Sequence, residues 1–128
     1  MPKWKSKAFN KLPAYRSQLQ ENIETPYLFF GFLHDEFTNA VQCEKKEEAI
    51  LILNYIRWCI ESAPRGTDAS NDIFTFVMNG FVEHIPDDEN SYSFAASLWP
   101  RALMVMLRDA LTYHGNEEQY RKHALQDA

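Results

Sequence analysis

The stretch EEAILILNYIRWCIES, residues 47–62, is apolar on nearly every side when it is drawn as a helix. Its apolar residues, spaced for two neighbouring faces, are Ala49, Leu51, Ile52, Leu53, Tyr55, Ile56, Trp58, Cys59 and Ile60. Only Asn54, Arg57 and Glu61 make a narrow polar stripe. Because a helix of this kind must be covered on several sides, it is predicted at the centre of a helical bundle. The stripe must then be paired in a structural network or reach a binding groove.

The preceding segment is predicted to form a helix over residues 26–42. Thr25 is a suitable N-cap, and Pro26 suits the first helical position, where its missing N–H does no harm. Helical spacing gives one apolar face, made of Phe30, Leu33, Phe37, Ala40 and Val41, and an opposite polar face with Asp35, Thr38 and Gln42. We interpret His34-Asp35-Glu36 as a solvated edge, because adjacent helical residues point in different directions and cannot converge as a catalytic pair.

A further helix is predicted from about residue 69 to residue 85, although the run IFTFV, residues 73–77, also has good strand propensity. The wider window favours a helix, since apolar residues recur every four positions at Ile73, Val77, Phe81 and Ile85. Gly80 costs on the order of 1 kcal/mol relative to alanine, which is tolerable if a neighbouring helix must approach closely there. Pro86 is predicted to end this helix.

Shorter helices account for the rest of the chain. They are predicted near residues 13–22, 91–98, 101–114 and 117–126, with Gly115-Asn116 separating the last two. The helix after Pro100 should bury Leu103, Met106, Leu107, Ala110 and Leu111. The expected fold class is therefore all-α. We expect one domain, residues 1–128, built as a bundle of five to seven helices with a largely buried central helix.

The composition indicates a folded cytosolic protein. A hydrophobic fraction of 45% excludes a disordered acidic chain, which lacks the apolar surface needed to offset chain entropy. Cys43 and Cys59 have no second pair beside them, so neither a zinc ribbon nor a disulfide framework is indicated. No secretory signal pattern and no apolar run of about 18 residues is present. We expect a cytoplasmic location. The basic N-terminal segment, residues 1–12, is a candidate flexible part of the chain.

Charge is unevenly distributed along the chain. Up to Gln20 there are five basic residues and no acidic one, whereas the remainder has eight basic and eighteen acidic residues, a net charge of −10. Residues 66–100 contain no Lys or Arg and six carboxylates, which are Asp68, Asp72, Glu83, Asp87, Asp88 and Glu89. Such a field repels phosphate backbones, so direct nucleic-acid binding is disfavoured outside the basic N-terminal segment. A cationic protein partner is favoured instead.

The densest acidic stretch, NGFVEHIPDDEN at residues 79–90, matches no metal or catalytic motif. Hard-cation loops need spaced oxygens with a glycine in the turn, and zinc-binding helices need His at i and i+4. We predict no metal, no cofactor and no catalytic residue. Helix ends explain part of the stretch, since Asp87 or Asp88 can stabilise the start of the helix that follows Pro86. They leave Glu83 unexplained, because a carboxylate near a helix C-terminus meets an unfavourable dipole.

The run NDIFTFVMNGFVEHIPDDENSYSFAASLWPRALMVML, residues 71–107, joins an apolar helix to an acidic connector and then to a helix that Leu98-Trp99-Pro100-Arg101 opens. In this helix order, over about residues 27–112, the chain resembles small all-helical bacterial proteins. Some of these serve as immunity partners of polymorphic or contact-dependent toxins. The resemblance implies a cytosolic, non-enzymatic protein that binds and occludes a toxin, and it transfers no site residue.

The resemblance and the charge together predict an immunity protein that neutralises a toxin domain. A nuclease toxin would fit, since its basic substrate surface is complementary to an acidic inhibitor. The predicted partner-binding residues are Asp68, Asp72, Glu83, Asp87, Asp88 and Glu89, with Tyr92 and Phe94 as aromatic anchors. A helical adaptor or regulator unrelated to toxins fits the same fold. A small enzyme would require Asn54, Arg57 and Glu61 to face His84 across an apolar pocket.

Overall fold

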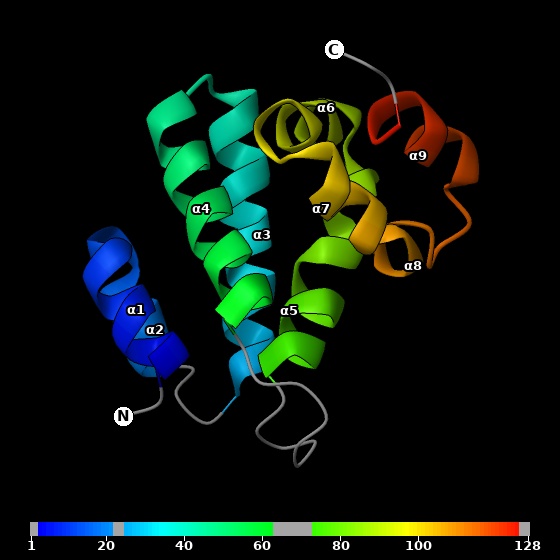
Figure 1. Ribbon diagram of the computed structural model, residues 1–128. Coiled ribbons are helices and arrows are strands. Elements are labelled where there is room, and N and C mark those ends of the chain that lie inside the picture. Colours follow the sequence, from blue (N-terminus) through cyan, green and yellow to red (C-terminus); the bar gives the residue numbers. More distant parts are fainter. Residues whose placement is uncertain (1–2, 22–24, 63–72, 126–128) are drawn as a thin grey trace.

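The computed structural model describes residues 3–21, 25–62 and 73–125, and every regular element in these ranges is helical (Figure 1). In chain order the elements are α1 (Lys3–Lys11), η1 (Pro13–Tyr15), α2 (Arg16–Glu21), α3 (Pro26–Gln42), α4 (Lys46–Ser62), α5 (Ile73–Gly80), η3 (Val82–Asp87), α6 (Glu89–Leu98), α7 (Arg101–Met106), α8 (Arg108–Leu111) and α9 (Glu117–His123). Two of them, η1 and η3, are 3-10 helices. The all-α prediction is confirmed. The nine α-helices in the described ranges exceed the predicted five to seven, because α1 was not foreseen and the helix expected after Pro100 is divided.

Helices α3 and α4 form a hairpin joined by a tight turn. Lys45 N–H donates to the Ala40 carbonyl at 2.8 Å and Glu44 N–H to the Val41 carbonyl at 3.2 Å, which is the Schellman pattern of helix termination. That pattern places Glu44 in the left-handed region, at φ 59°, where glycine is usual. The turn therefore forms without the residue that normally signals it.

Helix α3 has the central position in the bundle. It packs against α4 on one side and against α5 and α6 on the other (Figure 1). Its predicted apolar face is buried, with Phe30, Leu33 and Phe37 fully inaccessible. Helix α4 buries one broad side, whereas Leu51 on its other side is 47% exposed. Helix α4 was expected to be covered on nearly every side, and it is covered mainly on the side that packs against other helices.

Helix α1 lies in the basic N-terminal segment, residues 1–12, for which no helix was predicted. Its buried positions are Lys5 and Ala8, with Trp4 packed against the core at their edge. The Trp4 ring lies 5.8 Å from the Phe30 ring, and the Tyr55 hydroxyl donates to the Trp4 carbonyl at 2.8 Å. The buried face of α1 was not recognised in the sequence because it includes a lysine. A lysine can bury its aliphatic stem while its ammonium group stays in water.

The helix predicted over residues 69–85 ends earlier than expected, and its first predicted residues, 69–72, lie outside the described residues. Within the described residues α5 ends at Gly80, the chain bends at Phe81, and η3 follows with Pro86 inside it. The prediction that Pro86 ends the helix is therefore wrong. The predicted inward residues are nonetheless all buried, with Ile73 at 5% exposure and Val77, Phe81 and Ile85 at 0%. These apolar residues are buried although part of the segment is a 3-10 helix, because η3 also turns its apolar side chains toward the core.

Gly80 lies where α5 comes close to α3, which is the condition under which a glycine was expected to be tolerable there. A Cβ atom added there would lie 2.9 Å from the Phe30 Cβ and 3.1 Å from the Tyr27 carbonyl oxygen. Any side chain at this position would push the two helices apart. Gly80 thus sets the separation between α3 and the α5–η3 segment.

The helix predicted over residues 101–114 is divided at Leu107, whose φ of −89° and ψ of 7° separate α7 from α8. Leu103, Leu107 and Leu111 are buried as predicted. Met106 was expected inside and is 47% exposed, while Met104 is buried at 1%. Both methionines lie in α7, before the break, so the buried face of α7 is turned toward Met104 and away from Met106.

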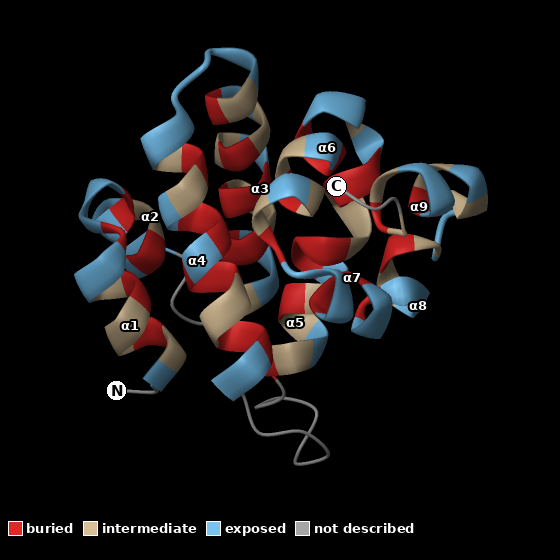
Figure 2. Cartoon of the chain, turned by 45° about the horizontal axis from the view of Figure 1, so that its top comes forward, coloured by how far each residue is buried: buried red, intermediate tan, exposed pale blue. Residues whose placement is uncertain are grey.

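Buried side chains line the inward sides of the helices, and the exposed residues gather on their outer sides and at their ends (Figure 2). In the described ranges, none of the helices combines the length and the hydropathy that crossing a membrane requires.

Candidate functional site

The three consecutive carboxylates Asp87, Asp88 and Glu89 have three different environments. Asp87 Oδ2 accepts a hydrogen bond from His84 Nδ1 at 3.1 Å, and the side chain remains 53% exposed. Asp88 is the N-cap of α6, where Oδ2 accepts from the Ser91 N–H at 2.9 Å and from the Ser91 hydroxyl at 2.8 Å. Glu89 forms an ion pair with Lys122 of α9. Capping by Asp88 follows the sequence expectation, whereas Glu89 is neutralised by a base from elsewhere in the chain.

Glu83 is largely buried, with a side-chain exposure of 14%. Its Oε1 lies 3.5 Å from His114 Nε2 and 3.9 Å from His84 Nε2. Because η3 replaces the end of the predicted long helix, Glu83 sits in the first turn of its element, where the helix dipole favours a carboxylate. Asp68 and Asp72 lie outside the described residues.

The two predicted aromatic anchors lie against the interior. Tyr92 has no exposed area, and its ring lies 5.0 Å from that of His123. It cannot contact a partner in this conformation, so its prediction as a surface anchor is corrected. Phe94 is partly buried and packs edge-on against Phe37, with ring centroids 6.2 Å apart. The helical period of α6 turns both aromatic residues toward their neighbours.

The polar stripe of α4 lies at the surface. Asn54 and Glu61 are exposed, and Arg57 forms an ion pair with Glu61 one turn away. The hollow that His84 lines has none of these three residues among its described walls. The stripe is therefore neither a buried network nor a wall of this groove, and the arrangement required for the small-enzyme hypothesis is not found.

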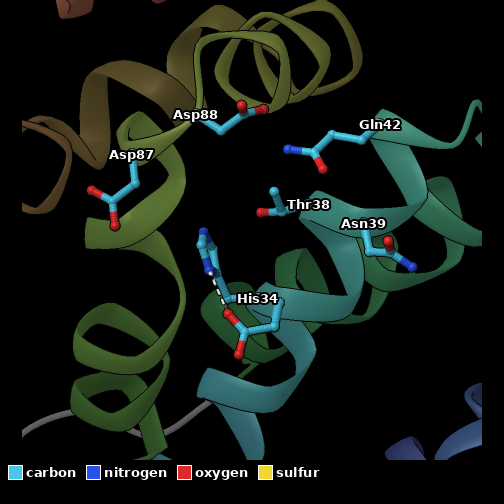
Figure 3. A pocket seen from close by; sticks show the side chains of 7 residues that line it. His34, Thr38, Asn39, Gln42, Asp87 and Asp88 are labelled. Carbon is cyan, nitrogen blue, oxygen red and sulfur yellow. Dashed lines mark ion pairs between the residues drawn. The ribbon is translucent and has the colours of Figure 1, made fainter.

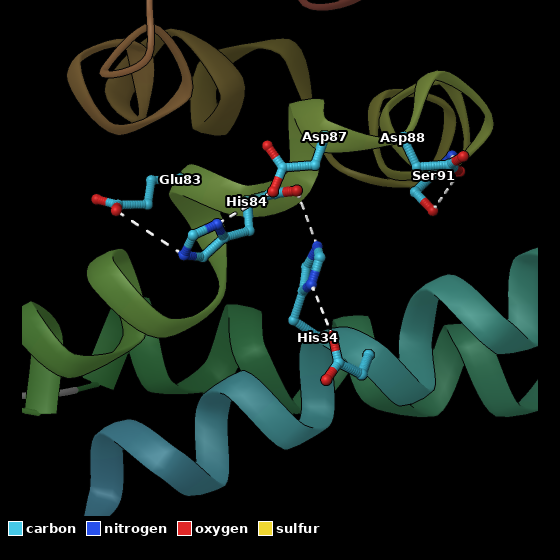
Figure 4. A network of polar contacts seen from close by, with 7 residues as sticks. His34, Glu83, His84, Asp87, Asp88 and Ser91 are labelled. Atoms are coloured by element: carbon cyan, nitrogen blue, oxygen red, sulfur yellow. Dashed lines mark hydrogen bonds and ion pairs between the residues drawn. The ribbon is translucent and has the colours of Figure 1, made fainter.

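Three histidines from different parts of the chain lie in a row. The ring of His34, on α3, is centred 5.7 Å from that of His84, on η3, which in turn lies 5.8 Å from the ring of His114. His34 Nε2 donates to the His84 carbonyl oxygen at 2.8 Å, and this bond ties α3 to η3 (Figure 4). In this row the His84 imidazole lies beside Asp87, and the imidazoles of His84 and His114 lie beside Glu83.

His34 is held in its neutral form. It is only 9% exposed, and burial lowers its pKa below the ordinary value, while the hydrogen bond to the His84 carbonyl acts in the opposite direction. Since a carbonyl can only accept, Nε2 carries the proton and Nδ1 is left as the acceptor nitrogen. At neutral pH this buried residue adds no positive charge to its surroundings.

Beside this row the surface is hollowed in two adjoining places, which together we call the α3–η3 groove. The first hollow has a volume of about 480 Å³ and a largely apolar end. That end is lined by Tyr27, Leu28, Gly31, Phe32 and Gly80, with His84 beside them. Tyr27 and Leu28 are 47% and 55% exposed. Large apolar side chains left in water beside a hollow are typical of a binding surface.

The second hollow, of about 360 Å³, has polar walls that include Thr38, Asn39, Gln42 and Asp88 (Figure 3). His34, Asp35 and Asp87 line both hollows and join them. Asp35 is 86% exposed. None of the described residues that line either hollow is Lys or Arg. The groove is therefore an acidic surface whose described walls supply no counter-charge of their own beyond the histidines.

Sequence reasoning found only part of this groove. Asp87 and Asp88 were predicted, whereas Asp35 was interpreted as a solvated edge and His34 was set aside with it. The signal was present in the polar face of α3, because Asp35, Thr38 and Gln42 follow helical spacing and all line the second hollow. What the spacing could not show is that η3 lies opposite this face.

The described residues contain no group of three or more His, Cys, Asp or Glu side chains arranged to hold a metal ion. Comparisons of the chain with protein-family models, with curated proteins and with solved structures give no match. The geometry of the groove is thus the main guide to what the protein binds.

Proposed function

We propose that the protein is a cytoplasmic immunity protein that binds a basic toxin domain through the α3–η3 groove and neutralises it. The observation that carries this proposal is the unbalanced charge of the groove. Asp35 and Asp87 are substantially exposed, and no described wall residue is Lys or Arg. Opposite charges raise the association rate of two proteins and select the partner.

The apolar end of the groove supports a protein partner over a small ion. Charge alone rarely gives tight binding, and Tyr27 and Leu28 offer apolar area directly beside the carboxylates. The binding surface proposed here is narrower than the acidic run of residues 83–89. It excludes Glu89, which pairs with Lys122, and Tyr92, which is buried.

A second candidate is a helical adaptor or regulator unrelated to toxins, which would use the same groove. The two hypotheses differ in the neighbouring reading frame, which for an immunity protein encodes a large secreted protein with a toxic C-terminal domain. The two hypotheses also differ in the effect on cells, since only an immunity protein restores growth to cells that express that domain.

The test is co-expression of the full chain with the toxic domain of the adjacent frame, followed by growth measurement and by stopped-flow association. The charge reversals Asp35→Lys and Asp87→Lys together should slow association by about tenfold or more at low salt. Asp109→Lys on α8 together with Glu118→Lys on α9 is the matched control, because this pair changes the net charge by the same amount at exposed positions outside the described walls of the groove.

Rescue by the wild-type chain, loss of rescue with the double reversal and retained rescue with the control would support the proposal. Absence of any rescue by the wild-type chain would remove the immunity function. Equal association rates for all three proteins would remove the groove as the binding surface.

A further inference from the structure

We propose that the α3–η3 groove recognises an arginine side chain of its protein partner, with the guanidinium held between Asp35 and Asp87 and an adjoining aliphatic residue placed on Tyr27 and Leu28. This inference rests on the proposed function for the origin of the arginine. Its chemistry is set by the groove itself and can be tested without the toxin.

The second hollow presents hydrogen-bond acceptors from two different elements. Asp35 comes from α3 and Asp87 from η3, and both line this hollow. Thr38 also lines this hollow, and its hydroxyl oxygen is buried without a hydrogen-bond partner. A buried hydroxyl left unpaired is uncommon in native structures, so a shift of the wall that admits a donor to this oxygen would supply a contact the free protein lacks.

Arginine fits these acceptors better than lysine does. A guanidinium is planar and carries five N–H donors in a fixed fork, so it can meet two carboxylates and a hydroxyl at once. An ammonium group is a compact and strongly hydrated charge, and leaving water costs it more. The adjoining first hollow contains the imidazole of His84, whose side chain is 32% exposed, and guanidinium groups stack on aromatic faces.

The first hollow explains why the arginine should have an aliphatic neighbour. Tyr27 and Leu28 lie one turn before Gly31, which has no side chain to fill the space beside them. A Cβ atom added at Gly31 meets no heavy atom within 4 Å, so the space is open. A leucine or valine next to the arginine would cover this apolar surface.

The experiment is titration of the full ¹⁵N-labelled chain with three N-acetylated pentapeptide amides, followed by NMR. The peptides have the sequence Ala-Leu-X-Leu-Ala, where X is arginine, lysine or citrulline. Citrulline keeps the shape of arginine and removes its charge. The arginine peptide should shift the amide signals of α3 and η3 with a dissociation constant on the order of 1 mM, and the lysine and citrulline peptides should bind about tenfold more weakly or worse.

Two variants locate the site. In Gly31→Leu the new Cβ meets open space and the rest of the side chain extends into the first hollow, so this variant should be at least as stable as the wild type and lose the arginine-peptide shifts. Asp35→Asn with Asp87→Asn removes both charges and should weaken the arginine peptide about tenfold. Glu118→Gln removes a charge from α9 and should leave the titration unchanged.

Equal binding of the arginine and lysine peptides would overturn the selectivity, and binding of the citrulline peptide equal to that of arginine would overturn the charge recognition. Absence of shifts, or shifts that Gly31→Leu leaves intact, would overturn the site. These outcomes are independent of growth rescue, so peptide recognition without toxin neutralisation would reject the proposed function and retain the arginine site.

Discussion

The α3–η3 groove and the contact between α6 and α9 are built from the same kind of residue and behave in opposite ways. In the groove, Asp35 and Asp87 face an open hollow whose described walls hold neither Lys nor Arg. At the α6–α9 contact, Glu89 is paired with Lys122, and nearby Glu117 is paired with Arg108. Asp87 and Glu89 are only two positions apart, yet Asp87 lies beside a histidine and lines the groove, whereas Glu89 is paired with a lysine of another helix.

The difference shows that consecutive acidic residues do not by themselves form one acidic surface, because the fold can place their side chains beside different neighbours. The Ser91 hydrogen bonds to Asp88 start α6, and the direction of the chain changes at that cap. Asp87 before the cap therefore lies beside His84 and lines the groove between η3 and α3, and Glu89 after it pairs with Lys122 of α9. The predictions below test whether the two regions are as different as this account requires.

The largest effect on stability is expected at Gly80, which sets the separation of the two elements that form the groove. Gly80→Ala places a methyl group 2.9 Å from the Phe30 Cβ, and overpacking of this kind should lower the free energy of unfolding by about 1–3 kcal/mol. Gly31→Ala, one helix away, is the matched control. Its methyl group meets open space and should raise the stability by about 0.5–1 kcal/mol. Urea denaturation of both variants decides the point, and equal stabilities would contradict the close approach.

Asp88 should stabilise the fold more than its exposed neighbours do. Removing the N-cap in Asp88→Ala leaves the Ser91 N–H without its acceptor and should cost about 1 kcal/mol of unfolding free energy. Asp87→Ala, one position earlier, removes a half-exposed carboxylate that caps no helix and should cost less. The unfolding curves of the two variants test whether Asp88 stabilises the fold as an N-cap and Asp87 does not. A larger loss of unfolding free energy for Asp87→Ala than for Asp88→Ala would contradict this difference.

The pH dependence of stability should report the buried imidazole of the groove. Folded His34 has a lowered pKa, so its contribution is complete above the unfolded pKa of about 6.5 and is lost as the pH falls toward the folded pKa. His34→Gln retains an N–H donor for the His84 carbonyl and cannot titrate. Unfolding free energies measured between pH 7.5 and about pH 5 should therefore fall less steeply for this variant than for the wild type. Parallel curves would show that His34 is not buried as described.

The smallest effect is expected at the α6–α9 contact. The hydrogen bond from Lys122 lowers the pKa of Glu89, but the pair lies in water and is screened by salt. Glu89→Gln should leave the unfolding midpoint unchanged within error at physiological salt. A clear loss of stability would mean that this edge is organised as tightly as the groove and would weaken the contrast between the two.

The sequence predicted the helical class and most of the buried positions because apolar residues at helical spacing must face a core. Ile73, Val77, Phe81 and Ile85 are buried although the helix that was to carry them ends at Gly80. Where the chain changes direction was harder to predict. No glycine or proline adjoins Leu107, where α7 ends, and Phe81 follows Gly80, a glycine that was predicted to lie inside the helix.

The groove was half predicted for a similar reason. Spacing along α3 placed Asp35, Thr38 and Gln42 on one face, and the acidic connector was recognised as unbalanced in charge. Joining them requires the position of η3 relative to α3. That position depends on Gly80 and on the bond from His34 to the His84 carbonyl, and neither contact can be read from residue spacing.

The central claim is that the α3–η3 groove is the surface that binds a basic protein partner. The affinity of Gly31→Leu for the toxic domain of the adjacent reading frame, measured by calorimetry beside an unfolding curve of the same variant, tests it most directly. We predict a chain at least as stable as the wild type that has lost most of its affinity, because the leucine side chain fills the groove. A stable Gly31→Leu chain that binds the domain as tightly as the wild type would contradict the account.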